Sequence, residues 1–211
     1  MTYLNLDNDD IEQQVPPSSN ILNQKALPVP IKFISNPDTQ NIIDKMLKIA
    51  HGRQGDAKYP TLVGLAAPQI GILKRIIIVG TDSLGDGKQP TLEAFINPIL
   101  IYKSTEKVDD REGCFSTGRV CGIVSRSKVI KFQAYTREGK KVTLELKDFP
   151  ARIMQHEIDH LDGVRFPDII TDDEKLHWVE EDKFGEYRIH WHEWKIKCPR
   201  EKWLSLKINQ N

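Results

Sequence analysis

The chain has 211 residues and a mass of 24.2 kDa, which predicts one domain with short appendages. Its 30 basic and 30 acidic side chains cancel, so the overall charge gives no reason to expect binding to DNA or to a membrane surface. Three cysteines do not suggest a disulfide framework, and we expect a reducing, cytoplasmic environment. Since no apolar run approaches the ~20 residues of a membrane span, we expect neither a span nor an export signal.

The N-terminal part of the chain predicts an arm, a helix and a loop. Residues 1–20 are polar and proline-containing, so we expect a flexible N-terminal arm. Residues 39–50 carry apolar side chains at helical spacing and end just before Gly52. The polar residues 51–60 then predict a surface loop near the cleft.

The middle of the chain predicts several strands. Residues 75–79 form a β-branched run, which favours a strand. Residues 95–101 are also apolar but contain Pro98, which predicts an edge strand or a bulge. Residues 129–135 and 141–146, separated by a short polar turn, predict a β-hairpin.

The next segment predicts a helix. Asp148 is a suitable N-cap, Pro150 suits a first helical turn, and Gly163 is a natural stop. Because the strands come first and this helix follows them, we expect an α+β fold with antiparallel β-sheets packed around a central metal-binding helix.

A short motif on that helix indicates a metal site. In Gln155-His156-Glu157-Ile158-Asp159-His160, the two histidines are four residues apart. On a helix they lie one turn apart on the same face and can bind one ion together. Glu157 then lies beside the ion, where it can move protons for a bound water.

A catalytic metal site usually has three protein ligands and an open position, so a third ligand is needed. One zinc-peptidase pattern would place it at Phe166, which cannot bind metal. A second pattern would use Glu180, which lies in a strongly acidic segment. The third candidate is Cys114, whose thiolate with two imidazoles suits Zn or Fe(II).

Three segments together resemble the peptide deformylase family in order and spacing. They are Gly-Leu-Ala-Ala-Pro-Gln-Ile-Gly at 64–71, Glu-Gly-Cys-Phe-Ser at 112–116, and the histidine motif at 155–160. The similarity implies a catalytic domain over residues 21–170, with Cys114 as the third metal ligand. It also implies that the substrate is the N-terminal formyl-methionine of nascent polypeptides, from which the enzyme removes formate.

The resemblance also implies roles for other residues. Glu157 would carry the proton from water to the leaving amine, while the Gln69 side-chain amide and the Phe115 backbone N–H would donate to the oxyanion. We expect one divalent ion, with Fe²⁺ as the native metal and Zn²⁺, Ni²⁺ or Co²⁺ as alternatives.

Four further residues are expected to contact the substrate. Gly64 begins a segment that a peptide backbone can approach closely, and Val63 flanks it. The resemblance implies that the substrate adds to this segment as a strand. Phe149 and Ile153 lie on the metal face of the predicted helix, and together with Val63 they would form an apolar pocket for methionine. A second, structural interpretation is that Phe149 and Ile153 belong only to the core.

Two charged side chains, Arg126 and Arg152, are expected to pair with Glu112 or Asp159 and orient the metal ligands. The alternative for either arginine is a solvated surface charge.

Two alternatives remain open, the first of them because of departures from the family pattern. The chain has Leu62, Phe115 and Gly118 where the family usually has glycine, leucine and proline. One alternative is therefore a non-catalytic homologue that binds peptides or the ribosome. The other is a zinc endopeptidase that uses Glu180 as its third ligand.

Residues 171–211 are expected to form a C-terminal extension that packs on the body. All four tryptophans lie between Trp178 and Trp203, which indicates buried apolar surface. Alternating residues at 187–194 predict a strand. A basic cluster suggests a ribosome contact as a further hypothesis; it comprises Lys195, Lys197, Arg200 and Lys202.

Overall fold

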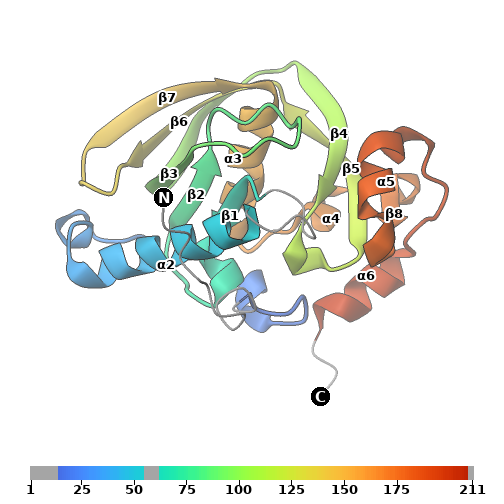
Figure 1. The fold of residues 1–211 in the computed structure, drawn as a ribbon, viewed down its shortest axis with the longest axis horizontal. Coiled ribbons are helices and arrows are strands. Elements are labelled where there is room, and N and C mark those ends of the chain that lie inside the picture. The colour runs from blue at the N-terminus through green and yellow to red at the C-terminus, as the bar shows by residue number, and fades with distance from the viewer. Residues whose placement is uncertain (1–13, 55–61, 209–211) are drawn as a thin grey trace.

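The computed structural model describes residues 14–54 and 62–208. Residues 1–13 of the expected arm, and most of the loop expected at 51–60, lie outside this range. The described chain forms two antiparallel sheets with helix α3 (Asp148–Leu161) between them (Figure 1). The expected α+β class, with sheets around a central helix, is therefore confirmed.

The larger sheet has five strands in the order β1-β2-β3-β6-β7. Their bounds are β1 Gly64–Ala66, β2 Ile76–Gly80, β3 Leu92–Lys103, β6 Val129–Tyr135 and β7 Lys141–Lys147. The predicted hairpin is β6 and β7, which pair in register from Val129↔Lys147 to Tyr135↔Lys141. Strand β1 forms one edge of this sheet and pairs only with β2 within the described chain.

Strand β2 is buried along its whole length because helices cover both faces of the sheet. Ile76 and Ile78 pack in one core with helix α2 (Pro37–Gln54), which begins and ends slightly outside the predicted 39–50. Ile77 and Val79 point to the opposite face and pack with α3. The two-residue period of one apolar strand thus fixes α3 against the sheet.

The apolar run at 95–101 lies inside β3, between β2 and β6. Pro98 has no N–H to donate, and the pairing register with β6 shifts around it. Asn97 adopts φ 53°, and its side chain accepts from Val29 N at 2.8 Å and donates to Val29 O at 2.7 Å. The predicted bulge is therefore confirmed, and the edge position is wrong.

The smaller sheet has the order β4-β5-β8 and lies on the other side of α3 (Figure 1). Its strands are β4 Lys107–Gly113, β5 Val120–Ser127 and β8 Leu176–Trp178. Cys114 follows β4 directly and precedes a 3₁₀ turn at Phe115–Thr117. The sheet therefore carries the second family motif to the side of α3.

The ends of α3 follow from local backbone geometry. Asp148 was expected as the N-cap, but it is the first helical residue, and Lys147 occupies the cap position. Asp148 has φ 54°, and its N–H donates to Lys128 O at 2.8 Å, because the β6–β7 hairpin leads directly into the helix. The expected stop at Gly163 is confirmed, since its φ is 74° and a Cβ there would lie 2.8 Å from Asn23 O.

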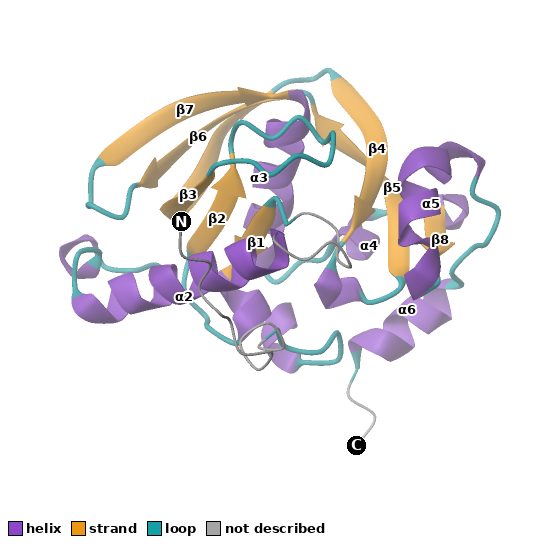
Figure 2. Cartoon of the chain, in the orientation of Figure 1, coloured by secondary structure: helices purple, strands orange, loops and turns teal. Residues whose placement is uncertain are grey.

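The C-terminal segment contains helices where a strand was expected. Figure 2 shows helical turns in this segment beside β5 and β8. Tyr187 belongs to α5, and Trp191 begins a 3₁₀ turn, so the strand predicted at 187–194 is wrong. Tyr187, Trp191 and Trp194 are three or four residues apart, which is the helical spacing, and they pack in one small core. The helices after α3 are α4 Phe166–Ile169, α5 Phe184–His190 and α6 Arg200–Lys207.

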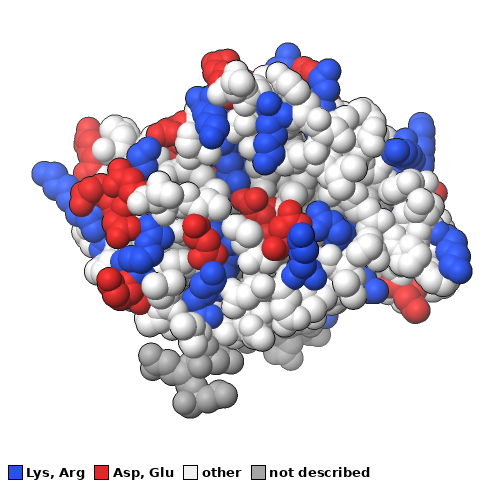
Figure 3. Space-filling view, turned by 180° about the vertical axis from the view of Figure 1, so that it is seen from behind, with Lys and Arg blue, Asp and Glu red and all other residues white. Residues whose placement is uncertain are grey.

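None of the helices in the described part of the chain combines the length and apolar character that a membrane crossing requires. The face opposite the view of Figure 1 shows lysine, arginine, aspartate and glutamate side by side (Figure 3). This mixture agrees with the equal numbers of the two signs, 30 and 30, in the chain.

Candidate metal centre

Two parts of the fold bring three metal-binding side chains together. Cys114 comes from the end of β4, and His156 and His160 come from α3. Cys114 Sγ lies 3.3 Å from His160 Nε2, which lies 3.2 Å from His156 Nε2. Ligands bonded at about 2.0–2.3 Å in a tetrahedral site are themselves about 3.3–3.7 Å apart. The three atoms therefore fit one ion, and this is the only such group among the described residues.

The orientation of His156 is fixed by a carboxylate. Its Nδ1 lies 2.9 Å from Glu112 Oε2, and an ionised carboxylate can only accept, so Nδ1 carries the proton and Nε2 faces the other ligands. Burial alone would lower the pKa of His156, but hydrogen bonds with Cys114 and Glu112 raise this pKa well above its ordinary value. Metal binding at Nε2 must therefore compete with a proton.

Glu112 is buried and accepts three hydrogen bonds from two arginines. Arg126 donates from Nε at 2.8 Å and from Nη2 at 2.9 Å, and Arg152 donates from Nη1 at 2.8 Å. Burial would raise the pKa of Glu112, but the hydrogen bonds and charge of Arg126 hold it far below its usual range. Arg126 also pairs with Asp159 on α3. The expected orienting role of both arginines agrees with this arrangement.

His160 is buried in a different environment. Burial, followed by the charge of His156, lowers the pKa of His160 well below its ordinary value, so its imidazole is neutral. A neutral imidazole is the form that binds a metal ion. Its Nδ1 is buried with no hydrogen-bond partner among the described residues.

Glu157 lies beside the three ligands and belongs to no ion pair in the described chain. It is 4% exposed, and its Oε2 has no hydrogen-bond partner there. Burial raises the pKa of Glu157 to about 7, which suits a group that both takes and gives protons near neutral pH. A Cβ on Gly64 would lie 2.3 Å from Glu157 Oε1, so the first family motif leaves the space that this carboxylate fills.

Gln69 is held with its amide toward the site. Its Oε1 accepts from Ala66 N at 2.7 Å, so Nε2 points the other way, 3.2 Å from both Cys114 Sγ and Ser116 Oγ. The Phe115 backbone directly follows Cys114, at the start of the 3₁₀ turn Phe115–Thr117 that also contains Ser116. Both predicted oxyanion donors are thus adjacent to the ligand set.

Arg165 is a structural contributor that the sequence reasoning missed. Its guanidinium is buried and donates to Ser116 O at 3.1 Å and to Pro17 O at 2.6 Å. Trp203 of α6 covers it at 4.7 Å. Arg165 therefore ties the arm and the C-terminal helix to the turn after Cys114, and no local pattern around it in the sequence predicts this.

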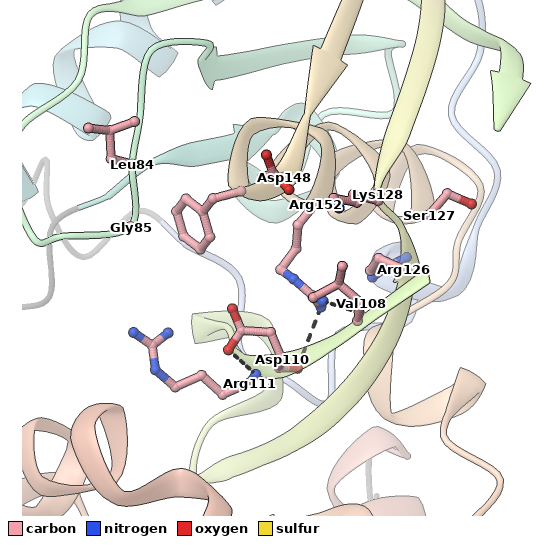
Figure 4. A pocket seen from close by; sticks show the side chains of 11 residues that line it. Leu84, Gly85, Val108, Asp110, Arg111, Arg126, Ser127, Lys128, Asp148 and Arg152 are labelled. Atoms are coloured by element: carbon pink, nitrogen blue, oxygen red, sulfur yellow. Dashed lines mark hydrogen bonds between the residues drawn. The ribbon is translucent and has the colours of Figure 1, made fainter. Parts of the chain in front are cut away.

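The four expected substrate residues lie in two places. Gly64 and Ile153 touch each other beside Glu157, and Ile153 is buried in the core. Val63 and Phe149 border a cavity of about 40 Å³. Phe149 also borders a larger cavity of about 230 Å³ (Figure 4). Charged residues that the sequence did not predict also border the larger cavity; they are Asp110, Arg111, Arg126, Lys128, Asp148 and Arg152.

The alternative third ligand, Glu180, lies elsewhere. Its carboxylate accepts from Arg119 Nη1 at 2.7 Å and from Trp178 Nε1 at 2.8 Å. It does not belong to the ligand group formed by Cys114 and the two histidines. The endopeptidase hypothesis based on Glu180 is therefore not supported.

Comparisons with known proteins agree with this geometry. The family model described as polypeptide deformylase matches residues 12–176. A peptide deformylase of Desulfitobacterium hafniense is 39% identical over 158 residues, covering 75% of this chain and 93% of the relative. Peptide deformylase 1 of Bacillus subtilis is 40% identical over 154 residues, covering 70% of this chain and 90% of the relative. The Met-Ala-Ser-bound structure of the class I type b peptide deformylase from Acinetobacter baumannii superposes with a TM-score of 0.65 and 32% identity, covering 74% of this chain and 96% of the other.

Proposed function

The chain belongs to the polypeptide deformylase family, and from this premise we propose that it removes formate from the N-terminal formyl-methionine of nascent polypeptides. The observation that carries the proposal is the convergence of Cys114, His156 and His160 beside a buried Glu157. This donor set suits a divalent ion with an open position for a reacting group.

When bound, the ion supplies an acidified water and polarises the formyl oxygen. Glu157 would accept a proton from the attacking water, because burial raises its pKa to about 7, close to neutral pH. The same carboxyl group then gives the proton to the departing amine. The Gln69 amide and the Phe115 backbone N–H donate hydrogen bonds to the oxygen on which negative charge develops.

The substrate would bind as an added strand. Strand β1 is an edge strand, and its first residue, Gly64, lies against Glu157. An extended peptide paired with β1 therefore brings its N-terminal formyl group to the metal ligands. The A. baumannii relative was solved with Met-Ala-Ser bound, which supports a peptide that begins with methionine as the ligand.

We also propose Fe²⁺ as the native ion, with Zn²⁺, Ni²⁺ or Co²⁺ as replacements that the same donors accept. The site would then work in a reducing cytoplasm, where the Cys114 thiolate persists. An Fe²⁺-loaded sample should lose activity in air, stay active under argon, and decay more slowly when loaded with Ni²⁺. Equal decay in air and argon would argue against an oxidisable thiolate–iron site.

A contact with the ribosome stays a hypothesis that the basic cluster in the C-terminal segment suggests. Lys195 is exposed, as such a contact needs. The other three are engaged within the protein: Lys197 pairs with Glu174 at 3.5 Å, Arg200 with Asp173 and with backbone carbonyls, and the Lys202 Nζ lies over the Trp178 ring. Co-sedimentation with ribosomes at low and high salt would test this contact.

The experiment for the main proposal compares three metal-loaded reactions. Formyl-Met-Ala-Ser should release formate, acetyl-Met-Ala-Ser should react far more slowly, and an unblocked long peptide should stay intact. Cleavage of internal peptide bonds would indicate an endopeptidase. Binding of formyl-Met-Ala-Ser without formate release would indicate a non-catalytic homologue.

A further inference from the structure

The smaller cavity beside Phe149 has a cationic border. Three basic residues line it: Lys88 from the loop after β2, Arg111 from β4 and Arg188 from α5. It shares Gly85, Arg111 and Phe149 with the larger cavity, so the two form adjoining parts of one groove. In Figure 4 the Arg111 guanidinium points away from Asp110, Arg126 and Arg152. Arg111 is therefore separate from the charge network that orients His156.

Arg111 and Arg188 border the same cavity, and neither guanidinium has a carboxylate partner among the described residues. Arg111 Nε donates to the Arg188 backbone oxygen at 2.8 Å, which fixes one guanidinium next to α5. Within residues 14–54 and 62–208, no carboxylate forms an ion pair with either arginine. Burial, and then the charge of Arg111, lowers the pKa of Arg188. Lys88 differs, because Asp86 pairs with it at 2.9 Å.

The groove lies where a bound peptide would continue. The reacting end of the substrate is at Glu157, which touches Gly64 at the start of β1. Val63, the residue before Gly64, lines the smaller cavity. A peptide that pairs with β1 in the antiparallel direction advances about 3.3 Å per residue, so the residues after its methionine would pass Val63 toward the cavity that the two arginines border.

We propose that Arg111 and Arg188 bind a carboxylate of the substrate and select formyl-methionyl peptides with an acidic side chain two or three residues downstream of methionine. The inference rests on the proposed deformylase function. A guanidinium pair that has no ion-pair partner in the described part of the chain offers the charge and the paired donors that a carboxylate needs. Arg188 lies beyond residue 176, where the family match ends, so the C-terminal segment would give this chain its own preference.

The test measures kcat/KM for formate release from C-terminally amidated formyl-Met-Ala-Xaa-Ala and formyl-Met-Ala-Ala-Xaa, with Xaa as Glu, Gln or Lys. Wild-type protein should prefer Glu over Lys at one of the positions by about three- to fivefold, the range of a partly exposed ion pair, and less at high salt. Peptides with Xaa as Gln and a free C-terminal carboxylate are assayed separately, because this carboxylate could bind the two arginines in place of an acidic side chain.

Variants of Arg188 separate recognition from folding. Arg188→Gln should remove the preference, Arg188→Lys should restore part of it, and Arg188→Glu should reverse it toward Lys peptides. Lys195→Gln is the matched control, because it removes one exposed charge of the same segment and borders neither cavity. Activity toward the Gln peptides is measured in every variant as the reference for the Glu and Lys peptides.

Two results would overturn the proposal: equal kcat/KM for Glu and Lys peptides in wild type, or an unchanged preference in Arg188→Gln. If kcat/KM rises only for the peptides with a free C-terminal carboxylate, the arginines bind a terminal carboxylate and not an acidic side chain. If no peptide releases formate, the proposed function fails, whereas affinities of the same unformylated peptides, measured by calorimetry, still test the arginine pair.

Discussion

The missing side chain of Gly64 makes room for the Glu157 carboxylate: a Cβ at Gly64 would lie 2.3 Å from Oε1 and 2.9 Å from Ile153 Cγ2. Gly64→Ala should therefore displace Glu157 while leaving the three metal ligands in place. We expect turnover to fall about 100-fold, as for a comparable misplacement of a reacting group, with unchanged metal content. Gly185→Ala in α5 is the control, because a Cβ there meets nothing within 4 Å. Full activity in Gly64→Ala would show that Glu157 does not act from this position.

The carboxylate that orients His156 gives a second prediction. In Glu112→Gln, the Nδ1–H of His156 loses its charged acceptor, and Arg126 and Arg152 lose their shared partner. Metal affinity should fall about 10–100-fold, as when outer partners of metal-binding histidines are changed. Competition with a chelator of known affinity measures this. Glu106→Gln, which removes an exposed surface ion pair with Lys128, should leave metal affinity unchanged.

The C-terminal helix gives a third prediction. Trp203 of α6 is fully buried, covers Arg165 at 4.7 Å, and donates from Nε1 to Asp168 at 2.9 Å. Trp203→Ala should lower the free energy of unfolding by about 3–5 kcal/mol. Its neighbour Leu204 is 46% exposed, and Leu204→Ala should change that free energy by no more than about 0.5 kcal/mol. Equal effects of the two substitutions in urea unfolding would contradict this packing.

We further propose that residues 171–211 form an extension whose packing stabilises the catalytic body of residues 21–170. Strand β8 pairs with β5 from Val120↔Trp178 to Gly122↔Leu176. A chain cut after Thr171 loses this pairing and exposes β5, so its melting temperature should fall. Amide protons of β5 should also exchange faster with solvent. If melting and exchange stay as in the full chain, the extension does not stabilise the body.

His177 gives the pH prediction. It is 1% exposed, its Nδ1 lies 3.0 Å from Tyr187 Oη, and burial lowers its pKa to about 4. The unfolded chain, with a histidine pKa near about 6.5, binds the proton more readily, so stability is lost as pH falls from about 6.5 to about 4.

The lowered pKa of His177 corresponds to at most about 3 kcal/mol in the free energy of unfolding. His177→Gln removes the titrating group and should make the unfolding free energies at pH 7 and pH 5 more nearly equal than in wild type. Exposed His192 is the control site, and His192→Gln should keep the wild-type difference. The same pH dependence in His177→Gln and wild type would show that another group is responsible.

The metal site was predictable because its signals are local. His156 and His160 are four positions apart on one helix, and this spacing alone places both imidazoles on one face. Cys114 was one of several candidates from residue chemistry, and the family resemblance selected it. The structure then brings its Sγ to 3.3 Å from His160 Nε2. What the sequence did not show is the contact between Gly64 and Glu157, which depends on how β1 packs on α3.

The less predictable parts depend on contacts distant in the chain. Strand β4 (Lys107–Gly113) has a polar sequence and is stabilised by pairing with β5, so apolar alternation did not indicate it. The apolar residues at 187–194 fit both the two-residue period of a strand and the three-to-four-residue period of a helix. Packing of Tyr187 and Trp191 in one small core favours the helical one. Arg188 reaches the groove only as part of that helix, so the cationic pair with Arg111 could not be predicted.

The most direct test of the central claim is formate release per bound metal ion in wild type, Cys114→Ala and Glu157→Gln. Wild type should bind one ion per chain and release formate from formyl-Met-Ala-Ser. Cys114→Ala should lose both, whereas Glu157→Gln should keep the ion and lose about 10²–10⁴-fold in turnover. A Cys114→Ala protein with a full metal complement, or a Glu157→Gln protein with wild-type turnover, would contradict the account.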